Sequence, residues 1–257
     1  MAEPELLHDG GGGRRILRVD GEVHRPLYPF SDSVHGLLMH LEQAGFEGAP
    51  RFVGVEDSGV EILSFVEGAA GGEGWNTVLT DHGLISAATL LRRYHGVVQS
   101  YKPPDDVEWS SGSVGGGQAG DIILHGDPGP WNVVWDGDDA VAFIDWDHAN
   151  PGLPVEDLAY LVAYAAPLCS DEVATSWMHH PDAPDRRHRL QVLAAAYGVP
   201  ADGLVAVAAD VLAKTNRTVE RMAERGLEPQ RSWAETGLLR RFWQRQDWIL
   251  TNCGGLV

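Results

Sequence analysis

The sequence predicts an α+β protein of two lobes, a small strand-rich lobe over residues 1–67 and a larger helical lobe over residues 68–257. Short apolar runs separated by turn residues fill the first part, whereas apolar residues at helical spacing dominate the second. The glycine-rich stretch 68–74 between them is typical of a flexible connector. A hydrophobic content of 44% is enough for a sizeable core.

Four short strands and one helix are expected in the first lobe. Asp20-Gly21 suits a tight turn between the first two strands, and Asp57-Ser58-Gly59 suits a turn between the last two. Between these pairs, Ser31 can cap a helix whose apolar residues recur at helical spacing until Gly45. The expected strands are 15–19, 22–25, 52–55 and 60–66.

The second lobe is expected to be helical, with three brief strands after its first helix. That helix carries apolar residues at helical spacing from Leu84 to Val98, and a Pro/Ser/Gly-rich loop over 103–120 follows it. The expected strands are 122–124, 133–135 and 140–144, and the expected later helices are 156–166, 186–197, 204–225 and 233–250.

The charge balance excludes several classes of partner. The chain carries 37 acidic and 19 basic residues, a formal charge of −18, so its surface should repel nucleic acid. It contains no run of about 18 or more apolar residues that could span a bilayer, and its start does not resemble a signal peptide. We therefore expect a cytoplasmic protein without membrane or nucleic-acid partners, in which Cys169 and Cys253 are unpaired thiols.

Polar residues gather around the last two strands of the second lobe. Asp127 lies on the loop that enters this expected hairpin, Asn132 at its start and Asp145 after its second strand. If the hairpin turns at Asp138-Asp139, Asn132 and Asp145 oppose each other, with Cβ atoms roughly 4.5 to 5.5 Å apart. One amide oxygen and one carboxylate then converge, a donor set suited to magnesium. Aspartates near turns are often merely solvated, but these end apolar strands, which favours a site.

Three motifs in this order resemble those of the aminoglycoside phosphotransferase and choline kinase-like family, relatives of the protein kinases. They are His125-Gly-Asp-(four residues)-Asn132, then Ile144-Asp145-Trp146-Asp147, then Pro154-Val-Glu-Asp157-Leu-Ala. The segment from Ile62 to Gly68 resembles that family's hinge between lobes. The resemblance implies a two-lobed protein-kinase-like fold with a shortened first lobe. It also implies that the protein transfers a phosphoryl group from ATP or GTP to a hydroxyl group.

The resemblance also implies a role for each matched residue. Asp127 would orient and deprotonate the acceptor hydroxyl, while Asn132 and Asp145 would hold Mg²⁺ on the nucleoside triphosphate. Phosphoryl transfer consists chiefly of positioning and charge neutralisation, so these few groups suffice. The adenine would meet the extended backbone of Ser64, Phe65 and Val66.

Three further residues are expected to support the site. His125 would support the catalytic loop from two positions before the base. Asp147 would either assist the metal or stabilise the loop. Asp157 begins a helix, so capping of that helix is the preferred role and a link to the catalytic loop is the second.

The first lobe departs from the family's pattern. Where a lysine would bind the α and β phosphates, the sequence has His24-Arg25, and Arg25 is the better substitute because its guanidinium can hold phosphate bidentately. The same arginine could equally be a surface residue. The helix that should present a partnering glutamate has His35 near the expected place, so the usual lysine–glutamate pair should be missing. Gly10 to Gly13 could form a phosphate-covering loop, although no strand of good quality precedes it.

Two main functions remain open from the sequence. One is a kinase for a small molecule, which the acidic surface weakly favours as cationic, such as an aminoglycoside-like antibiotic or an amino alcohol. The other is a non-catalytic nucleotide-binding or immunity-type protein of the same fold, against which the intact set of three polar residues argues. A metal-dependent hydrolase is disfavoured because no second histidine lies at ligand spacing. The protein is expected to be a monomer or homodimer. Candidate walls of its acceptor pocket are Trp233, Trp243, Asp247 and Trp248, although a tryptophan-rich stripe in the core is the favoured interpretation of each.

Overall fold

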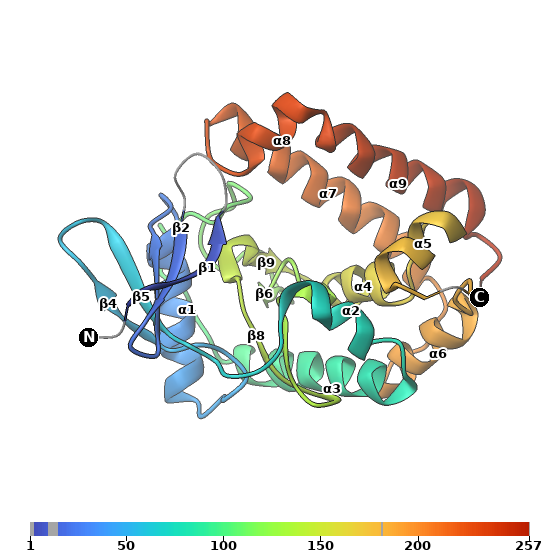
Figure 1. Cartoon of the computed structure of the whole chain (residues 1–257), viewed down its shortest axis with the longest axis horizontal. Helices are drawn as coiled ribbons and strands as arrows, with labels where there is room; N and C mark the ends of the chain where they lie inside the picture. Colours follow the sequence, from blue (N-terminus) through green and yellow to red (C-terminus); the bar gives the residue numbers. More distant parts are fainter. Residues whose placement is uncertain (1–2, 10–14, 181, 257) are drawn as a thin grey trace.

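The computed structural model describes residues 3–9, 15–180 and 182–256, and it places one antiparallel sheet beside a mainly helical part (Figure 1). The sheet runs in the order β1-β2-β3-β5-β4. This arrangement confirms the α+β class and the two lobes expected from the sequence. The strands of the sheet are β1 (Glu5–Asp9), β2 (Arg15–Val19), β3 (Glu22–Pro26), β4 (Phe52–Val55) and β5 (Val60–Ser64).

The four strands expected in the first lobe are confirmed, as is the helix between them, α1 (Ser31–Gln43). Asp20 and Gly21 form the turn between β2 and β3, and both have positive φ. The strand expected to reach residue 66 ends instead at Ser64. Beyond it the amide of Phe65 still donates to Gly21 O at 3.1 Å, which continues the register of β3 and β5 by one further residue.

Strand β1 is an element that the sequence pattern does not predict. It pairs with β2 at the edge of the sheet, where Leu6 and Leu7 are 47% and 38% exposed. An edge strand held by backbone hydrogen bonds needs no buried face, so it leaves no apolar alternation to detect. The expectation that no strand of quality precedes the glycine run is therefore wrong, while Gly10 to Gly13 themselves lie outside the described residues.

The helical part is built around α3 (Asp81–Val98), which contacts α4 (Pro154–Ala165) and α6 (Arg186–Tyr197). Leu84 and Leu91 on α3 are fully buried. Two small antiparallel sheets complete this part, β6 with β9 and β7 with β8. Their strands are β6 (Ile122–Leu124), β7 (Val133–Asp136), β8 (Asp139–Phe143) and β9 (Asn150–Gly152), and the other helices are α2 (Gly74–Thr77), α5 (Asp171–Met178), α7 (Leu204–Glu224), α8 (Gln230–Thr236) and α9 (Leu238–Asn252).

Three features of the helical part differ from the sequence-based expectation. The single helix expected over 233–250 is two helices, because Gly237 adopts φ +77° and ends α8. Helix α5 was not expected, although Ser170 caps it by accepting a hydrogen bond from the amide of Val173. Strand β9 has three residues, too few to show a period, and it forms only because β6 lies beside it.

One continuous hydrophobic core joins the two parts of the described chain. Leu38 and Leu41 of α1 belong to the same cluster of buried side chains as Leu91 of α3 and Leu158 of α4. Tyr94 of α3 also donates its hydroxyl to Ile123 O at 2.7 Å, which ties the helix to β6. The sheet and the helices therefore share apolar contacts.

The expectations about cysteines and membrane spans can be compared with the described chain. Cys169 and Cys253 are both buried and free, as expected. Across residues 3–9, 15–180 and 182–256, helices of the length and apolarity needed to cross a bilayer do not occur.

The segment that joins the two parts is fixed to the β7–β8 hairpin rather than freely flexible as expected. Ala69 exchanges two backbone hydrogen bonds with Trp135, at 2.9 and 2.8 Å. Gly68 has φ +142°, a conformation restricted almost entirely to glycine. A Cβ atom at this position would lie 2.5 Å from the carbonyl oxygen of Trp135, so only glycine fits.

We expect Gly68→Ala to lower the free energy of unfolding by roughly 3 kcal/mol, because it adds backbone strain and a clash with a backbone atom. Urea unfolding followed by circular dichroism measures this change. Gly59→Ala is the matched control, since Gly59 has φ +80° and a Cβ there meets no atom within 4 Å. The control should lose only about 1 kcal/mol, and equal losses in both variants would contradict the close approach at Gly68.

Candidate active site

The β7–β8 hairpin is displaced by one residue from the expected register. Val133 opposes Phe143, and Asp136 opposes Asp139, so the turn is formed by Gly137 and Asp138. The expectation that Asn132 and Asp145 are directly opposed is therefore wrong. The displacement has two causes, a turn that comes earlier than expected and a bulge between Val134 and Trp135. Neither can be recognised from the Asp138-Asp139 pair in the sequence.

Asp145 nevertheless returns to the site because of its backbone conformation. The amide of Ile144 donates to Asn132 O at 2.9 Å, which closes the end of the hairpin. Asp145 then adopts a left-handed conformation, φ 60° and ψ 66°, and leaves the strand direction. Its side chain is 48% exposed, and its charge acts on Asp127 and raises the pKa of that carboxyl in addition to burial. The two carboxylates therefore share one electrostatic environment.

Asp127 and Asn132 contact each other directly. The amide nitrogen of Asn132 donates to both Asp127 O and Asp127 Oδ2, each at 2.9 Å. Trp131 Nε1 donates to the same Oδ2 at 3.3 Å. The turn of 3₁₀ helix over Pro130–Asn132, which begins with proline, brings Asn132 back over Asp127. Because the nitrogen makes both bonds of Asn132 to Asp127, neither bond uses its carbonyl oxygen, the atom that a cation would bind.

The second carboxylate oxygen of Asp127 lacks a hydrogen-bond partner. Oδ1 is buried, and among the described residues none completes a hydrogen bond to it, although the Tyr160 hydroxyl approaches the carboxylate. Burial raises the pKa of Asp127 to about 6, against the opposing effect of the nearby His148 imidazole. Part of the residue is exposed, but the oxygen atom itself is not. A buried oxygen without a donor marks a place where a ligand hydroxyl would be stabilising.

His125 joins the candidate catalytic loop, residues 125–132, to the end of β8. Its Nδ1 accepts from the amide of Asp127 at 3.3 Å, and its Nε2 donates to Ile144 O at 3.1 Å. The ring is fully buried against Trp146, at 4.4 Å between centroids. Burial lowers the pKa of His125 to about 4, so the imidazole is neutral near pH 7 and can serve both bonds at once.

Asp157 takes the second of its two expected roles. Its Oδ2 accepts from the amide of His125 at 2.8 Å, and its Oδ1 accepts from the amide of Gly126 at 2.9 Å. His95 Nε2 also lies 3.1 Å from Oδ2. The preferred role, capping of its own helix, is wrong: α4 begins at Pro154 without a side-chain cap, and the carboxylate points to the loop. The spacing along the chain could not distinguish the two roles.

Arg25 lies inside the site rather than on the surface. It is 5% exposed and bonds three carboxylates: Nε to Glu61 at 2.8 Å, Nη2 to Asp147 at 2.8 Å and Nη1 to Asp145 at 3.3 Å. Burial alone would lower the pKa of Arg25, but the charges of Asp147, Glu61 and Asp145 raise it above its usual value. The guanidinium therefore stays charged and neutralises acids from both lobes.

Glu61 is a site residue that the sequence analysis missed. It opposes Arg25 in the register of β3 and β5, it is fully buried, and its second oxygen lies 2.6 Å from His35 Nε2 of α1. Arg25 and Glu61 thus form a buried arginine–glutamate pair whose acid comes from a strand, with His35 on the helix beside it. A signal was present, since Glu61 is a lone acid within the apolar run 60–66.

The three residues expected to meet the adenine lie where β5 leaves the sheet. The amide of Ser64 donates to Arg51 O at 2.8 Å, and that of Phe65 donates to Gly21 O at 3.1 Å. Arg18 lies over the Phe65 ring, 3.8 Å from its centroid. Two of the three amides thus already have acceptors, whereas no described residue accepts from the amide of Val66.

The donors around Asp127 fit a cation that brings most of its own ligands. Within the part of the chain that the structure describes, no three His, Cys, Asp or Glu side chains are grouped to hold a metal ion. Mg²⁺ takes one or two carboxylates and completes its octahedron with water and phosphate, so Asp145 and the Asn132 carbonyl oxygen are a sufficient protein contribution. The exposed side chain of Asp145 suits such an open site.

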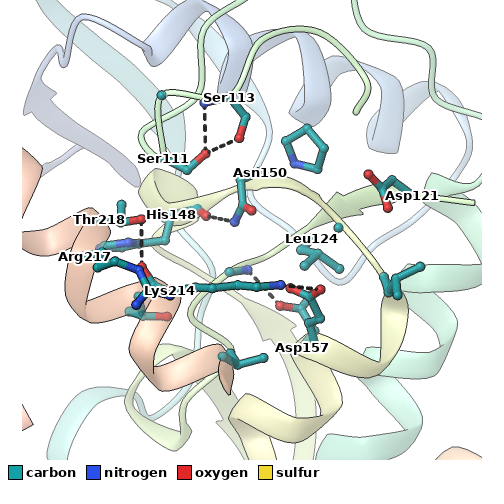
Figure 2. A pocket seen from close by; sticks show the side chains of 18 of the residues that line it. Ser111, Ser113, Asp121, Leu124, His148, Asn150, Asp157, Lys214, Arg217 and Thr218 are labelled. Atoms are coloured by element: carbon teal, nitrogen blue, oxygen red, sulfur yellow. Dashed lines mark hydrogen bonds and ion pairs between the residues drawn. The ribbon is translucent and has the colours of Figure 1, made fainter. Parts of the chain in front are cut away.

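A cavity of about 660 Å³ opens between the catalytic loop and α7 (Figure 2). Gly126, His148 and Asp157 line it from the catalytic side. Ser111 and Ser113 line it from the loop expected over 103–120, which the buried Trp109 anchors through a hydrogen bond to Gly115 O at 2.8 Å. This volume is that of a typical small-molecule site.

The four residues expected to form acceptor walls do not line this cavity. Trp243 Nε1 donates to Glu220 at 2.6 Å, and Trp248 packs against the core. Trp233 packs edge-on against Phe242. The cavity wall is α7 instead, because α8 and α9 lie on the far side of that helix, as Figure 1 shows.

Comparison with known proteins places the chain in a family. The family model described as "Phosphotransferase enzyme family" matches residues 118–200, which include Asp127, Asn132, Asp145 and Asp157. The Trifolitoxin immunity protein of Rhizobium leguminosarum bv. trifolii is 34% identical over 201 residues, 76% of this chain and 74% of that protein. The chain belongs to the phosphotransferase enzyme family. The resemblance drawn from the motifs is therefore confirmed.

Solved structures of phosphotransferases share the fold. The amicoumacin kinase in complex with AMP-PNP, Ca²⁺ and its antibiotic has a TM-score of 0.59 at 12% identity, with 97% of this chain and 88% of that chain covered. The gentamicin complex of APH(2'')-IIa has a TM-score of 0.59 at 12% identity, with coverages of 95% and 90%. A choline/ethanolamine kinase family protein of Mesorhizobium loti has 0.53 at 16%, with coverages of 96% and 92%. These likenesses confirm the protein-kinase-like fold.

Within this phosphotransferase fold, we expect Asp157→Asn to lower the free energy of unfolding by roughly 3 kcal/mol, since an amide can accept only one of the two backbone N–H bonds. Urea unfolding measures the loss. Asp139→Asn is the control, because Asp139 is 69% exposed and pairs only with the exposed His82. The control should change stability by less than about 1 kcal/mol. An Asp157 variant as stable as this control would show that the loop does not depend on the carboxylate.

The buried Asp127 predicts a pH-dependent effect of Asp127→Asn on stability in metal-free buffer. The folded protein binds this proton more tightly than the unfolded chain, so ionisation costs stability as the pH rises from about 4 to about 6. The difference from the ordinary value of 3.8 corresponds to roughly 3 kcal/mol, which the neutral asparagine avoids. Urea unfolding with EDTA should therefore show a gain for the variant at pH 8 that largely disappears at pH 4.5. A gain of the same size at both pH values would contradict the raised pKa.

Proposed function

We propose that this protein is a small-molecule kinase, which moves the γ-phosphoryl group of Mg-ATP or Mg-GTP to a hydroxyl group of an acceptor bound beside Asp127. The observation that carries this proposal is the state of Asp127. Asn132 and Trp131 hold Oδ2, while Oδ1 is buried and receives no hydrogen bond of normal geometry from the described residues, although the Tyr160 hydroxyl lies near the carboxylate. An acceptor hydroxyl would supply the missing donor and would leave its proton on this oxygen as the new O–P bond forms.

The neighbouring residues support the remaining parts of the reaction. Asn132 and Asp145 would hold the magnesium ion, which neutralises charge on the transferred phosphoryl group and on the leaving diphosphate. Arg25 would keep Asp145 and Asp147 in place as a charged partner. Three of its nitrogens already donate to carboxylates, so its primary role is to position Asp145.

The cavity between the catalytic loop and α7 is our candidate for the acceptor site. Gly126, which lines it, directly precedes Asp127, and His148 in its wall is near enough to affect the pKa of that carboxyl. The adenine would lie at the other side of the site, against the amide of Val66. We place the protein in the cytoplasm, where the nucleotide is available.

A second candidate function is immunity to a toxin, with or without turnover. The observation that favours it is the 34% identity with a protein named for trifolitoxin immunity. A kinase that modifies a toxic acceptor would satisfy both proposals at once. A protein that merely binds the toxin would not need Asp127, so the two forms differ in their response to its replacement.

We expect Asp127→Asn to lower turnover by roughly 10²- to 10⁴-fold, the usual effect of removing a positioned proton acceptor, while nucleotide affinity stays nearly unchanged. The assay is release of nucleoside diphosphate from ATP and GTP over a panel of hydroxylated antibiotics and amino alcohols. Asp145→Ala should instead remove the magnesium dependence of nucleotide binding in calorimetry.

The outcomes separate the two candidates. Unchanged turnover in Asp127→Asn would remove this residue from the mechanism. Nucleotide binding without turnover in the native protein, together with toxin protection that survives Asp127→Asn, would favour the non-catalytic immunity protein. Asp139→Asn serves as the control here too, since it changes a surface charge outside the site.

A further inference from the structure

The cavity wall formed by α7 carries positive charge. Lys214, Arg217 and Arg221 lie three, then four residues apart, so they follow one face of the helix, and all three line the cavity. Figure 2 shows Lys214 extending from α7 across the cavity toward Asp157, and Arg217 beside α7. The chain has only 19 basic residues against 37 acidic ones, so three on one cavity wall contrast with the rest of the protein.

Among the described residues, two of these three cations find no acidic partner. Lys214 Nζ lies 2.8 Å from Glu156 Oε1 and is thereby neutralised. Arg221 donates only to the neutral hydroxyl of Thr218, at 3.2 Å. Over the residues that the structure describes, no carboxylate lies within ion-pair distance of Arg217 or Arg221.

The next arginine along the helix behaves differently. Arg225, which ends α7 and does not line the cavity, pairs with Glu108 at 3.1 Å. A protein with this excess of acids can therefore supply a carboxylate to an arginine of α7. Among the described residues it supplies none to Arg217 and Arg221, the two arginines at the cavity.

The acids that line the cavity do not cancel this charge. Glu156 is held by Lys214, and Asp157 is buried under the catalytic loop with both oxygens bonded to backbone amides. Asp121 accepts from the amide of Gln118, and in Figure 2 it lies on the opposite side of the cavity from Arg217. The cavity thus has a cationic wall on α7 and a weakly acidic side facing it.

We infer that the acceptor carries an anionic group, a carboxylate or a phosphate, which Arg217 and Arg221 bind while its hydroxyl faces Asp127; this rests on the kinase function proposed above. Guanidinium groups hold such anions through paired, charge-assisted hydrogen bonds. The net charge of the surface had favoured a cationic acceptor, but net charge governs encounter, whereas the side chains of the cavity govern what binds there. The volume of 660 Å³ admits a hydroxy acid of the size of a modified amino acid or short peptide.

The test compares matched acceptors in the full-length protein. N-acetylserine and N-acetylhomoserine are offered as free acids and as methyl esters, glycerol 3-phosphate represents the phosphate arm, and an aminoglycoside represents the cationic arm. Binding is measured by calorimetry with Mg-AMP-PNP present, and turnover is measured as ADP release. We expect the free acids or the phosphate to bind more tightly than the esters and the aminoglycoside.

The double substitution Arg217→Gln with Arg221→Gln should weaken binding of the anionic compounds by about tenfold to a hundredfold and remove the preference over the esters, as expected for charge-assisted bonds. Arg225→Gln is the matched control and should keep the preference. Unfolding midpoints of both variants confirm that they fold. The inference is overturned if the aminoglycoside or the esters bind better, if no anionic compound binds, or if the double variant keeps the preference.

Failure of the kinase function gives a different result. Binding of an anionic compound that depends on both arginines, without ADP release, would leave the cavity assignment standing while removing the proposed reaction. Release of ADP with the aminoglycoside alone would keep the kinase and overturn the anionic acceptor.

Discussion

Each oxygen of Asp157 accepts a backbone N–H from the catalytic loop, and this pair of bonds determines where Asp127 lies. The carboxylate comes from the first turn of α4, a helix whose face is otherwise buried in the core. Gly126, one of the two residues whose amides donate to Asp157, has φ +81°. A Cβ atom there would collide with the carbonyl oxygen of His148. The loop therefore has one conformation in which its backbone donors, its glycine and its histidine all fit.

A second set of charges stabilises the opposite side of the site. Arg25 contacts Glu61, Asp145 and Asp147, and the two buried acids among them, Glu61 and Asp147, would be costly to bury without it. His35 completes the set by contacting the other oxygen of Glu61. In this way Arg25 of the small sheet positions Asp145, which follows β8. The two lobes therefore meet through ion pairs where the nucleotide is proposed to bind.

The sequence was a good guide wherever a single periodic pattern decided the outcome. The strands at β4 and β6 and the helix at α6 follow from apolar spacing and have the expected bounds. The β7–β8 register did not, because the chain turns earlier than expected and a bulge then restores only part of the difference, neither of which changes the apolar pattern. Asp145 approaches the site through a left-handed conformation that spacing cannot predict.

The charged contacts were harder to predict than the elements. Glu61 and Arg25 lie 36 residues apart, and only the pairing of β3 with β5 makes them neighbours. The two possible roles of Asp157 have the same sequence signature, since a carboxylate in a first helical turn can point to its own helix or to a nearby loop. Side-chain direction in three dimensions separates these alternatives.

The shared hydrophobic core constrains how the molecule can admit a nucleotide. Leu38 and Leu41 of α1 belong to the same buried cluster as residues of α3 and α4, so a wide rotation of the small sheet away from the helices would expose apolar surface to water. Entry must instead rely on smaller rearrangements of side chains and of the segment around Phe65. The same continuity implies that heat should melt both lobes in a single cooperative transition.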